Sequence, residues 1–167
     1  MKPHAEIEEV WPRDGRIRLV GRLVGAVSQG FAEPGGSDGW HLLLVRRGGD
    51  GRRLRYAARV EDERFEGSVP VADLAAPDLA ASAPATAVPA TTDSTGVDSA
   101  GAEEWDVHLT DGTARLRAGR RLDDIRGKKH ILVYPEQRVL GVSVRPYFTV
   151  KDNLSLECRG GRTGAAR

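Results

Sequence analysis

Apolar and polar residues alternate along the stretch from Glu104 to Gly119, on both sides of an Asp111-Gly112 pair. Alternation with a period of two is typical of a half-buried β-strand, and Asp-Gly is a strong signal for a two-residue type I′ turn. The stretch therefore predicts a β-hairpin in which Thr110 faces Thr113. The same turn fixes the other facing pairs, which are Leu109 with Ala114, Val107 with Leu116, and Asp106 with Arg117.

The rest of the chain shows similar alternation. Further strands are predicted at residues 16–24, 40–47, 54–60, 65–71, 131–134, 142–150 and 154–158, with short helical turns at 71–76 and 122–126. Eight or nine strands without a long amphipathic helix predict an all-β protein. We expect an immunoglobulin-like antiparallel sandwich of two sheets.

Residues 77–102 contain repeated Ala, Pro, Ser and Thr, with no aromatic and no basic residue. Such a segment cannot bury enough apolar surface to offset the entropy of ordering, so it predicts a disordered mid-chain loop. About four strands are expected on each side of the loop, and a closed sandwich needs roughly seven, so both halves must form one domain. The predicted organisation is an N-terminal tail at 1–15, half of the sandwich at 16–76, the loop, the other half at 103–158, and a disordered tail at 159–167.

Charge and composition narrow the possible functions only slightly. The chain has 25 basic and 24 acidic residues, and 21 of the basic ones are Arg. This bias, together with abundant Ala and Gly, indicates a high-GC coding background, so the arginine count is weak evidence for nucleic-acid binding. Cys158 is the single cysteine, which excludes an internal disulfide and a Cys-based zinc site within one chain. No segment approaches the roughly 20 apolar residues of a membrane span, and no signal-peptide pattern is seen, so a cytoplasmic protein is expected.

Four segments carry a family resemblance: FEGSVPVADLA, WDVHLTDG, RLRAGRRLDDIRGKKHILVYP and VSVRPYFTVKDNLSLEC. They resemble the immunoglobulin-like β-sandwich domains that accompany actinobacterial glycosyltransferases and CDP-glycerol glycerophosphotransferases of teichoic-acid type. The resemblance covers about 55 residues, Trp105 to Cys158, and also Phe65 to Ala75. It implies a non-catalytic accessory module for glycosyl or glycerophosphoryl transfer onto cell-surface polymers or secondary metabolites. The implied partner is a transferase enzyme, or a glycan or nucleotide-sugar ligand.

Candidate ligand-binding residues lie on the polar face of the hairpin and in the segment after it. Asp106, His108, Arg115 and Arg117 form a polar platform for a sugar or a carboxylate, although a solvated histidine and a surface ion pair of about 0.2 to 1 kcal/mol also explain them. The densest basic cluster follows and would suit phosphate groups or an acidic partner, or would be a solvated loop. Its members are Arg120, Arg121, Arg126, Lys128 and Lys129. The cluster lacks the aromatic residues of a nucleic-acid surface, so nucleic acid is not an expected partner.

No pattern predicts catalytic residues, a metal site or a cofactor. The four histidines have no metal-binding spacing, and the adjacent acids Asp123 and Asp124 point in different directions on a strand or a helix. Two other hypotheses stay open. One is a small enzyme or ligand-sequestering β-protein of a biosynthetic cluster, with a cavity between the sheets. The other is an interaction domain that uses an exposed sheet edge, at the strand containing Pro70 or at the last strand.

Overall fold

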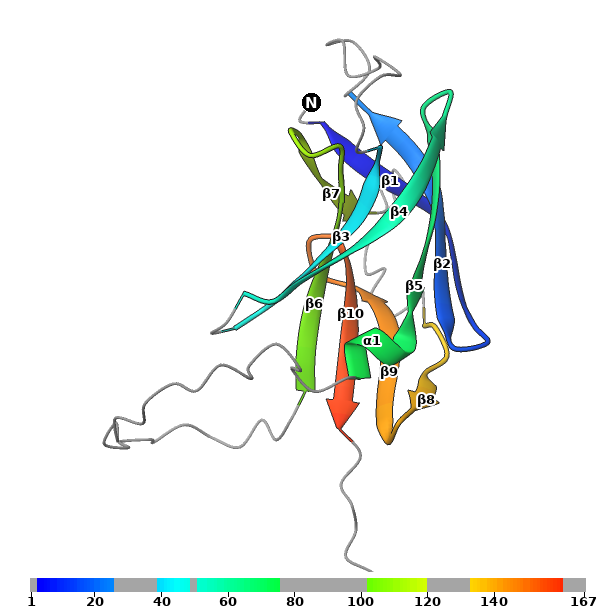
Figure 1. Ribbon diagram of the computed structural model, residues 1–167, viewed down its shortest axis with the longest axis vertical. Coiled ribbons are helices and arrows are strands. Elements are labelled where there is room, and N and C mark those ends of the chain that lie inside the picture. Colours follow the sequence, from blue (N-terminus) through cyan, green and yellow to red (C-terminus); the bar gives the residue numbers. More distant parts are fainter. Residues whose placement is uncertain (1–2, 26–38, 49–50, 76–101, 120–132, 161–167) are drawn as a thin grey trace, which may run out of the picture.

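The computed structural model describes residues 3–25, 39–48, 51–75, 102–119 and 133–160, and most of them lie in β-strands (Figure 1). The predicted all-β class is confirmed. The predicted loop at 77–102 lies outside the described residues except for Ala102, which begins a strand, and the helical turn at 122–126 also lies outside them. The predicted tail at 159–167 is corrected at Arg159 and Gly160, which end the last strand, and residues 161–167 are not among those described. In chain order the elements are β1 (His4–Arg13), β2 (Arg16–Val24), β3 (His41–Arg46), β4 (Arg53–Glu61), β5 (Arg64–Pro70), α1 (Val71–Ala75), β6 (Ala102–Thr110), β7 (Arg115–Gly119), β8 (Gln137–Val139), β9 (Val142–Phe148) and β10 (Leu154–Gly160).

Strand β1 corrects the predicted N-terminal tail. It pairs with β2 through a tight turn in which Asp14 and Gly15 both have positive φ angles. The ladder shifts register between Ile7 and Glu9, so Glu8 is an extra residue in the strand. A β-bulge of this kind breaks the period-two alternation. The core-facing Ile7 and Val10 are therefore three residues apart, which hid the strand in the sequence.

Seven strands close into a barrel in the order β3-β4-β5-β2-β1-β7-β6, because β3 also pairs with β6. All of these pairings are antiparallel except that of β1 with β7. The expected arrangement of two separate sandwich sheets is therefore not what these strands form. The β3–β6 pairing joins residues 59 to 69 positions apart in the sequence. Alternation within each strand does not specify which distant strand it will pair with.

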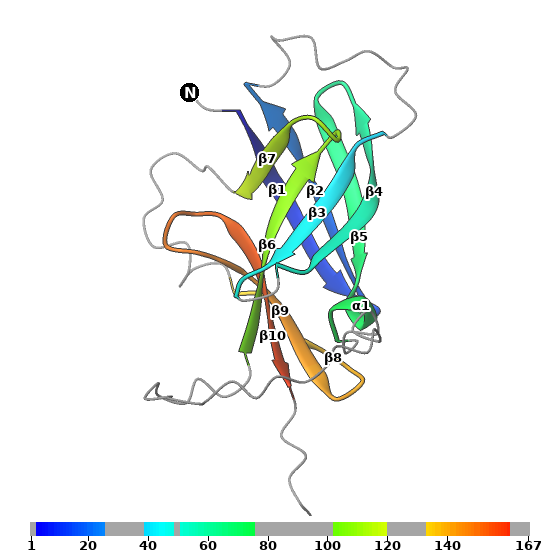
Figure 2. The ribbon, with the colours of Figure 1, turned by 60° about the vertical axis from the view of Figure 1, so that its left-hand side comes forward.

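A second, smaller sheet continues from the barrel through β6. The first half of β6 pairs with β10, which pairs with β9, and β9 pairs with β8. Figure 2 shows β6 running from the barrel, between β3 and β7, into this smaller sheet beside β10. Strand β10 thus has partners on both sides, as does β5, which ends at Pro70. Neither strand is the exposed edge that the interaction-domain hypothesis requires.

The β6–β7 hairpin forms, but in a different register from the predicted one. Thr110 faces Arg115 and Leu109 faces Leu116, a shift of two residues. The Asp111 carboxylate accepts hydrogen bonds from the backbone N–H groups of Thr113 and Ala114, at 2.8 and 2.6 Å. This side-chain turn replaces the two-residue turn. A shift of two keeps every side chain on its predicted face.

The core fills the barrel and continues beneath the smaller sheet. Its largest fully buried side chains are Trp105, Phe65 and Phe148, surrounded by Val, Leu and Ile. The predicted helical turn after β5 is confirmed as α1, which buries Val71 and Leu74. Apolar side chains thus occupy the inward-facing positions, so the outer face of the sheets carries the polar chemistry.

Candidate functional site

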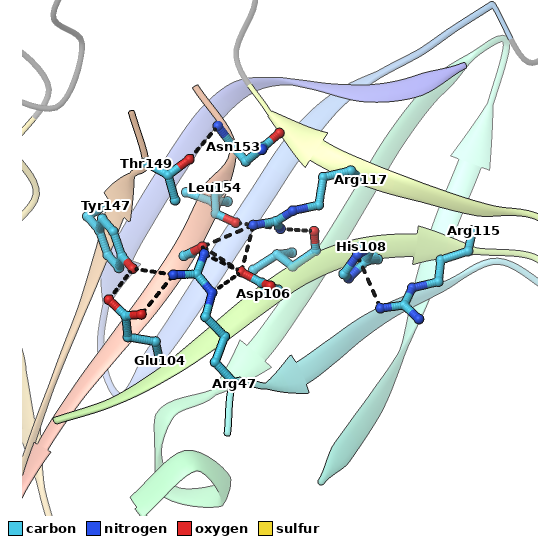
Figure 3. A network of polar contacts seen from close by, with 12 residues as sticks. Arg47, Glu104, Asp106, His108, Arg115, Arg117, Tyr147, Thr149, Asn153 and Leu154 are labelled. Atoms are coloured by element: carbon cyan, nitrogen blue, oxygen red, sulfur yellow. Dashed lines mark hydrogen bonds and ion pairs between the residues drawn. The ribbon is translucent and has the colours of Figure 1, made fainter. Parts of the chain in front are cut away.

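The four predicted platform residues lie on the outer face of β6 and β7, where Figure 3 shows them. The expected contact between Asp106 and Arg117 is present, with Nη2 of Arg117 2.8 Å from Oδ1 of Asp106. Because His108 is directly opposite Arg117, this contact is diagonal across the ladder. The predicted basic residues Arg120, Arg121, Arg126, Lys128 and Lys129 lie outside the described residues.

Arg117 lies beside the point where β6 stops pairing with β7 and starts pairing with β10. The β6–β7 ladder ends at His108 and Arg117, and the β6–β10 ladder begins at Asp106 and Ser155. Between the ladders, Nη1 of Arg117 donates to the backbone carbonyls of Val107 and Leu154, at 2.6 and 2.8 Å. Its Nη2 group also donates to the Ser155 hydroxyl at 3.1 Å. The guanidinium therefore supplies hydrogen bonds that neither ladder provides at this point.

Arg47, directly after β3, holds two carboxylates on the adjacent strand β6. Its Nε and Nη2 groups donate to Oδ1 of Asp106 at 2.9 and 2.6 Å, and Nη1 donates to Oε2 of Glu104 at 2.7 Å. Burial alone would raise the pKa of Asp106. The guanidinium groups of Arg47 and Arg117 and the Ser155 hydroxyl outweigh burial and lower this pKa below its ordinary value. Both acids are therefore ionised at neutral pH.

Tyr147 of β9 extends these contacts across the smaller sheet. Its hydroxyl donates to Oε1 of Glu104 at 2.7 Å. This hydrogen bond is the main reason that the pKa of Glu104 is lowered, while burial and the Glu104 carboxylate raise the pKa of Tyr147 to about 12. We call the connected set the polar network; its members are Arg47, Glu104, Asp106, Arg117, Tyr147 and Ser155. Sequence reasoning did not place Arg47, Tyr147 and Ser155 in the site, because they join it only through strand pairing over long sequence distances. It also left out Glu104, although Glu104 lies two residues before Asp106 on the same face of β6.

The Tyr147 hydrogen bond can be measured by a double-mutant cycle with Glu104. We expect Tyr147→Phe to lower the free energy of unfolding by at least about 1 kcal/mol, the usual net contribution of one hydrogen bond. The loss should be larger than for a neutral pair, because the Glu104 acceptor is charged. In the Glu104→Gln background the same change should cost clearly less, as measured by urea unfolding at pH 7. Equal losses in both backgrounds would show that the two side chains are not coupled.

A groove of about 300 Å³ opens beside this network, along β9 and β10. We call it the β9 groove; its described lining is Glu104, Val133, Tyr134, Arg145, Pro146, Tyr147, Glu157 and Arg159. Within it, Arg145 and Arg159 each donate to a different oxygen of Glu157, both at 2.9 Å. The groove thus combines two tyrosines with paired charges. Val133 and Tyr134 were predicted to be in a strand, but they form an irregular segment before Pro135.

His108 differs from the solvated strand histidine considered in the sequence. Only 9% of its surface is exposed. Burial, followed by the positive charges of Arg115 and Arg117, lowers its pKa to about 4, so the ring is neutral at physiological pH. Its Nε2 atom lies 3.3 Å from Nη2 of Arg115, and its Nδ1 atom is buried on the side of the Asp106 backbone.

Other kinds of site find little support in the described part of the chain. It contains no group of three or more His, Cys, Asp or Glu side chains arranged to hold a metal ion. Cys158 is buried, and burial raises the pKa of its thiol to about 12, so the reactive thiolate is disfavoured. No helix within the described ranges is long and apolar enough to cross a membrane.

The fold is similar to part of TarS from S. aureus. One TarS structure has a TM-score of 0.53 and 14% identity, and the match covers 96% of this chain and 25% of TarS. A structure of TarS 217–571 has a TM-score of 0.50 and 12% identity, covering 96% of this chain and 39% of the fragment. The similar region therefore lies within that fragment, and this chain spans about a quarter of the length of TarS. At these identities the likeness shows the fold alone.

No known family profile matches the sequence. No curated protein matches it at a significant level.

Proposed function

We propose that this protein is a non-catalytic β-barrel module that binds a glycan or a nucleotide sugar through the β9 groove. It would serve a transferase that adds glycosyl or glycerophosphoryl groups to cell-surface polymers or secondary metabolites. The groove is the observation that carries the proposal. The resemblance of residues 105–158 to accessory domains of such enzymes supports the link to glycosyl transfer, and the chain shares its fold with part of TarS.

The chemistry of the groove suits a sugar. A sugar ring presents an apolar C–H face and a rim of hydroxyl groups that both donate and accept hydrogen bonds. Tyr134 and Tyr147 offer aromatic rings and a hydroxyl group, a combination of apolar body and polar handle. Arg145 and Arg159 offer donors, while Glu104 and Glu157 offer acceptors. A volume of about 300 Å³ is at the lower end of ligand pockets, which fits one or two sugar rings better than a long polymer segment.

The groove is also held in place before a ligand arrives. Tyr147 is fixed by Glu104, Glu104 by Arg47, and Arg145 by Glu157. Side chains already ordered by their neighbours lose less conformational entropy when they bind a ligand. The polar network therefore has a supporting role: its other members orient Glu104 and Tyr147, the two members that line the groove.

Calorimetric titration with short cell-wall glycans, nucleotide sugars and CDP-glycerol tests the proposal. We expect one ligand class to bind saturably and Arg145→Gln to weaken its binding at least tenfold, since a hydrogen bond to a charged group contributes about 1.5 to 3 kcal/mol. Arg18→Gln is the matched control, because Arg18 is also paired with a glutamate, Glu66, but on the opposite side of the barrel. Absence of binding across the panel, or equal weakening by both variants, would contradict the proposal.

A further inference from the structure

Three arginines on the outer face of the barrel have no carboxylate partner among the described residues. Arg53 and Arg55 on β4, and Arg115 on β7, form no ion pair in the described part of the chain. Most other exposed strand arginines in the described part are paired, and Arg16 on β2 is an exception. Arg59, on the same face of β4, lies 2.5 Å from Glu61.

Strand register brings these arginines around two histidines. Leu43 on β3 faces Arg55 on one side and His108 of β6 on the other. His41, two residues before Leu43 on the same face of β3, faces Thr110 of β6, and Thr110 in turn faces Arg115 of β7. Facing residues in an antiparallel ladder have Cβ atoms about 4.5 to 5.5 Å apart, and long side chains reach their diagonal neighbours. We call this surface the arginine–histidine face; it consists of His41, Arg53, Arg55, His108 and Arg115, with Leu43 at its centre.

The histidines act as acceptors for two of the arginines. Nη2 of Arg55 is 3.4 Å from Nδ1 of His41, and Nη2 of Arg115 is 3.3 Å from Nε2 of His108. A guanidinium can only donate, so each of these ring nitrogens must be the unprotonated one. The neutral His108 ring therefore carries its proton on Nδ1, which is buried and lies on the side of the Asp106 backbone.

The arginine–histidine face therefore has more hydrogen-bond donors than acceptors. Three guanidinium groups surround a small apolar floor, while the carboxylates of Asp106 and Asp111 on the same hairpin already accept hydrogen bonds from other groups. A surplus of positive charge and unmatched donors is the complement of an oxyanion. Guanidinium groups match the geometry of phosphate and carboxylate oxygens in particular.

We propose that the arginine–histidine face binds an oxyanion, either a phosphate ester or a carboxylate. The anion would lie between Arg55 and Arg115, over Leu43, and take hydrogen bonds from both guanidinium groups. This site is separate from the β9 groove and does not depend on the proposed sugar binding. It would give the barrel a second contact with an anionic ligand.

The test is an NMR titration of the full chain with dimethyl phosphate, inorganic phosphate and acetate, at constant ionic strength set with chloride. The ring signals of His41 and His108 report on the face. We expect them to shift saturably with at least one probe, and Arg55→Gln combined with Arg115→Gln to weaken that binding at least tenfold. Arg59→Gln removes an arginine from the same face of β4 that Glu61 already neutralises, so binding should change less than twofold. Thermal unfolding of each variant shows that the fold is retained.

The probes separate the two sources of the anion. Binding of dimethyl phosphate but not acetate assigns a phosphodiester, and the reverse assigns a carboxylate. Ring signals that do not move with any probe would overturn the proposal, as would an equal effect of Arg59→Gln. Neither outcome affects the β9 groove, because none of the substituted residues lines it.

Discussion

Replacing Arg117 with Met is expected to lower the free energy of unfolding by about 3 kcal/mol. The change removes the donors to two backbone carbonyls, those of Val107 and Leu154, and leaves Asp106 with one cation fewer. Removing one partner of a buried ion pair costs about 3 to 5 kcal/mol, and the partial exposure of Arg117 places this case at the lower end. Methionine retains much of the apolar length, so the loss reports the polar contacts.

Urea unfolding at pH 7 measures this loss. Arg18→Met is the control, because its ion pair with Glu66 is half-exposed and should contribute less than 1 kcal/mol. Adding Asp106→Asn to Arg117→Met should restore part of the stability, since the carboxylate then no longer needs a cation. A loss below 1 kcal/mol for Arg117→Met would contradict this prediction. It would show that water can replace the guanidinium at the point where β6 stops pairing with β7 and starts pairing with β10.

Acidification from pH 7 to pH 4.5 is expected to cost about 2.5 kcal/mol of stability through His108 alone. The pKa of His108 is lowered to about 4 in the folded protein, against about 6.5 in an unfolded chain. The unfolded state therefore binds the proton first. The contribution of this histidine is fully present above pH 6.5 and is lost as the pH falls toward 4.

The comparison with His108→Gln isolates this effect, because the other titrating groups are the same in both proteins. The wild-type protein should lose about 2.5 kcal/mol more than the variant between pH 7 and pH 4.5 in urea unfolding experiments. The same pH dependence in both proteins would mean that His108 titrates normally, and hence that water reaches its ring.

Local patterns in the sequence predict most strands but not how they are assembled. The hairpin of β3 and β4, the strand β5 and the pair β9 and β10 follow from alternation and turn residues. Strand β1 does not, because the extra residue Glu8 puts Ile7 and Val10 out of phase. Barrel closure depends on a pairing of β3 with β6 that no local signal encodes.

The candidate site was partly predictable for a similar reason. Asp106 and Arg117 were assigned to one face of one hairpin, and the two-residue shift in register preserved that face. The burial of His108 was not predictable from its own strand, because it depends on the neighbouring strands that carry Leu43 and Arg117. Arg47 and Tyr147 join the site from strands far away in the sequence.

The most direct test of the central claim is to map a bound sugar ligand onto the barrel by two-dimensional NMR of the backbone amides. With the tightest ligand from the calorimetric panel, we predict that the largest shifts occur at Arg145, Tyr147 and Glu157, which line the β9 groove. Amides of β2, β4 and β5, on the other side of the barrel, should not move. Shifts confined to those strands, or spread evenly over the molecule, would contradict the assignment of the groove as the binding site.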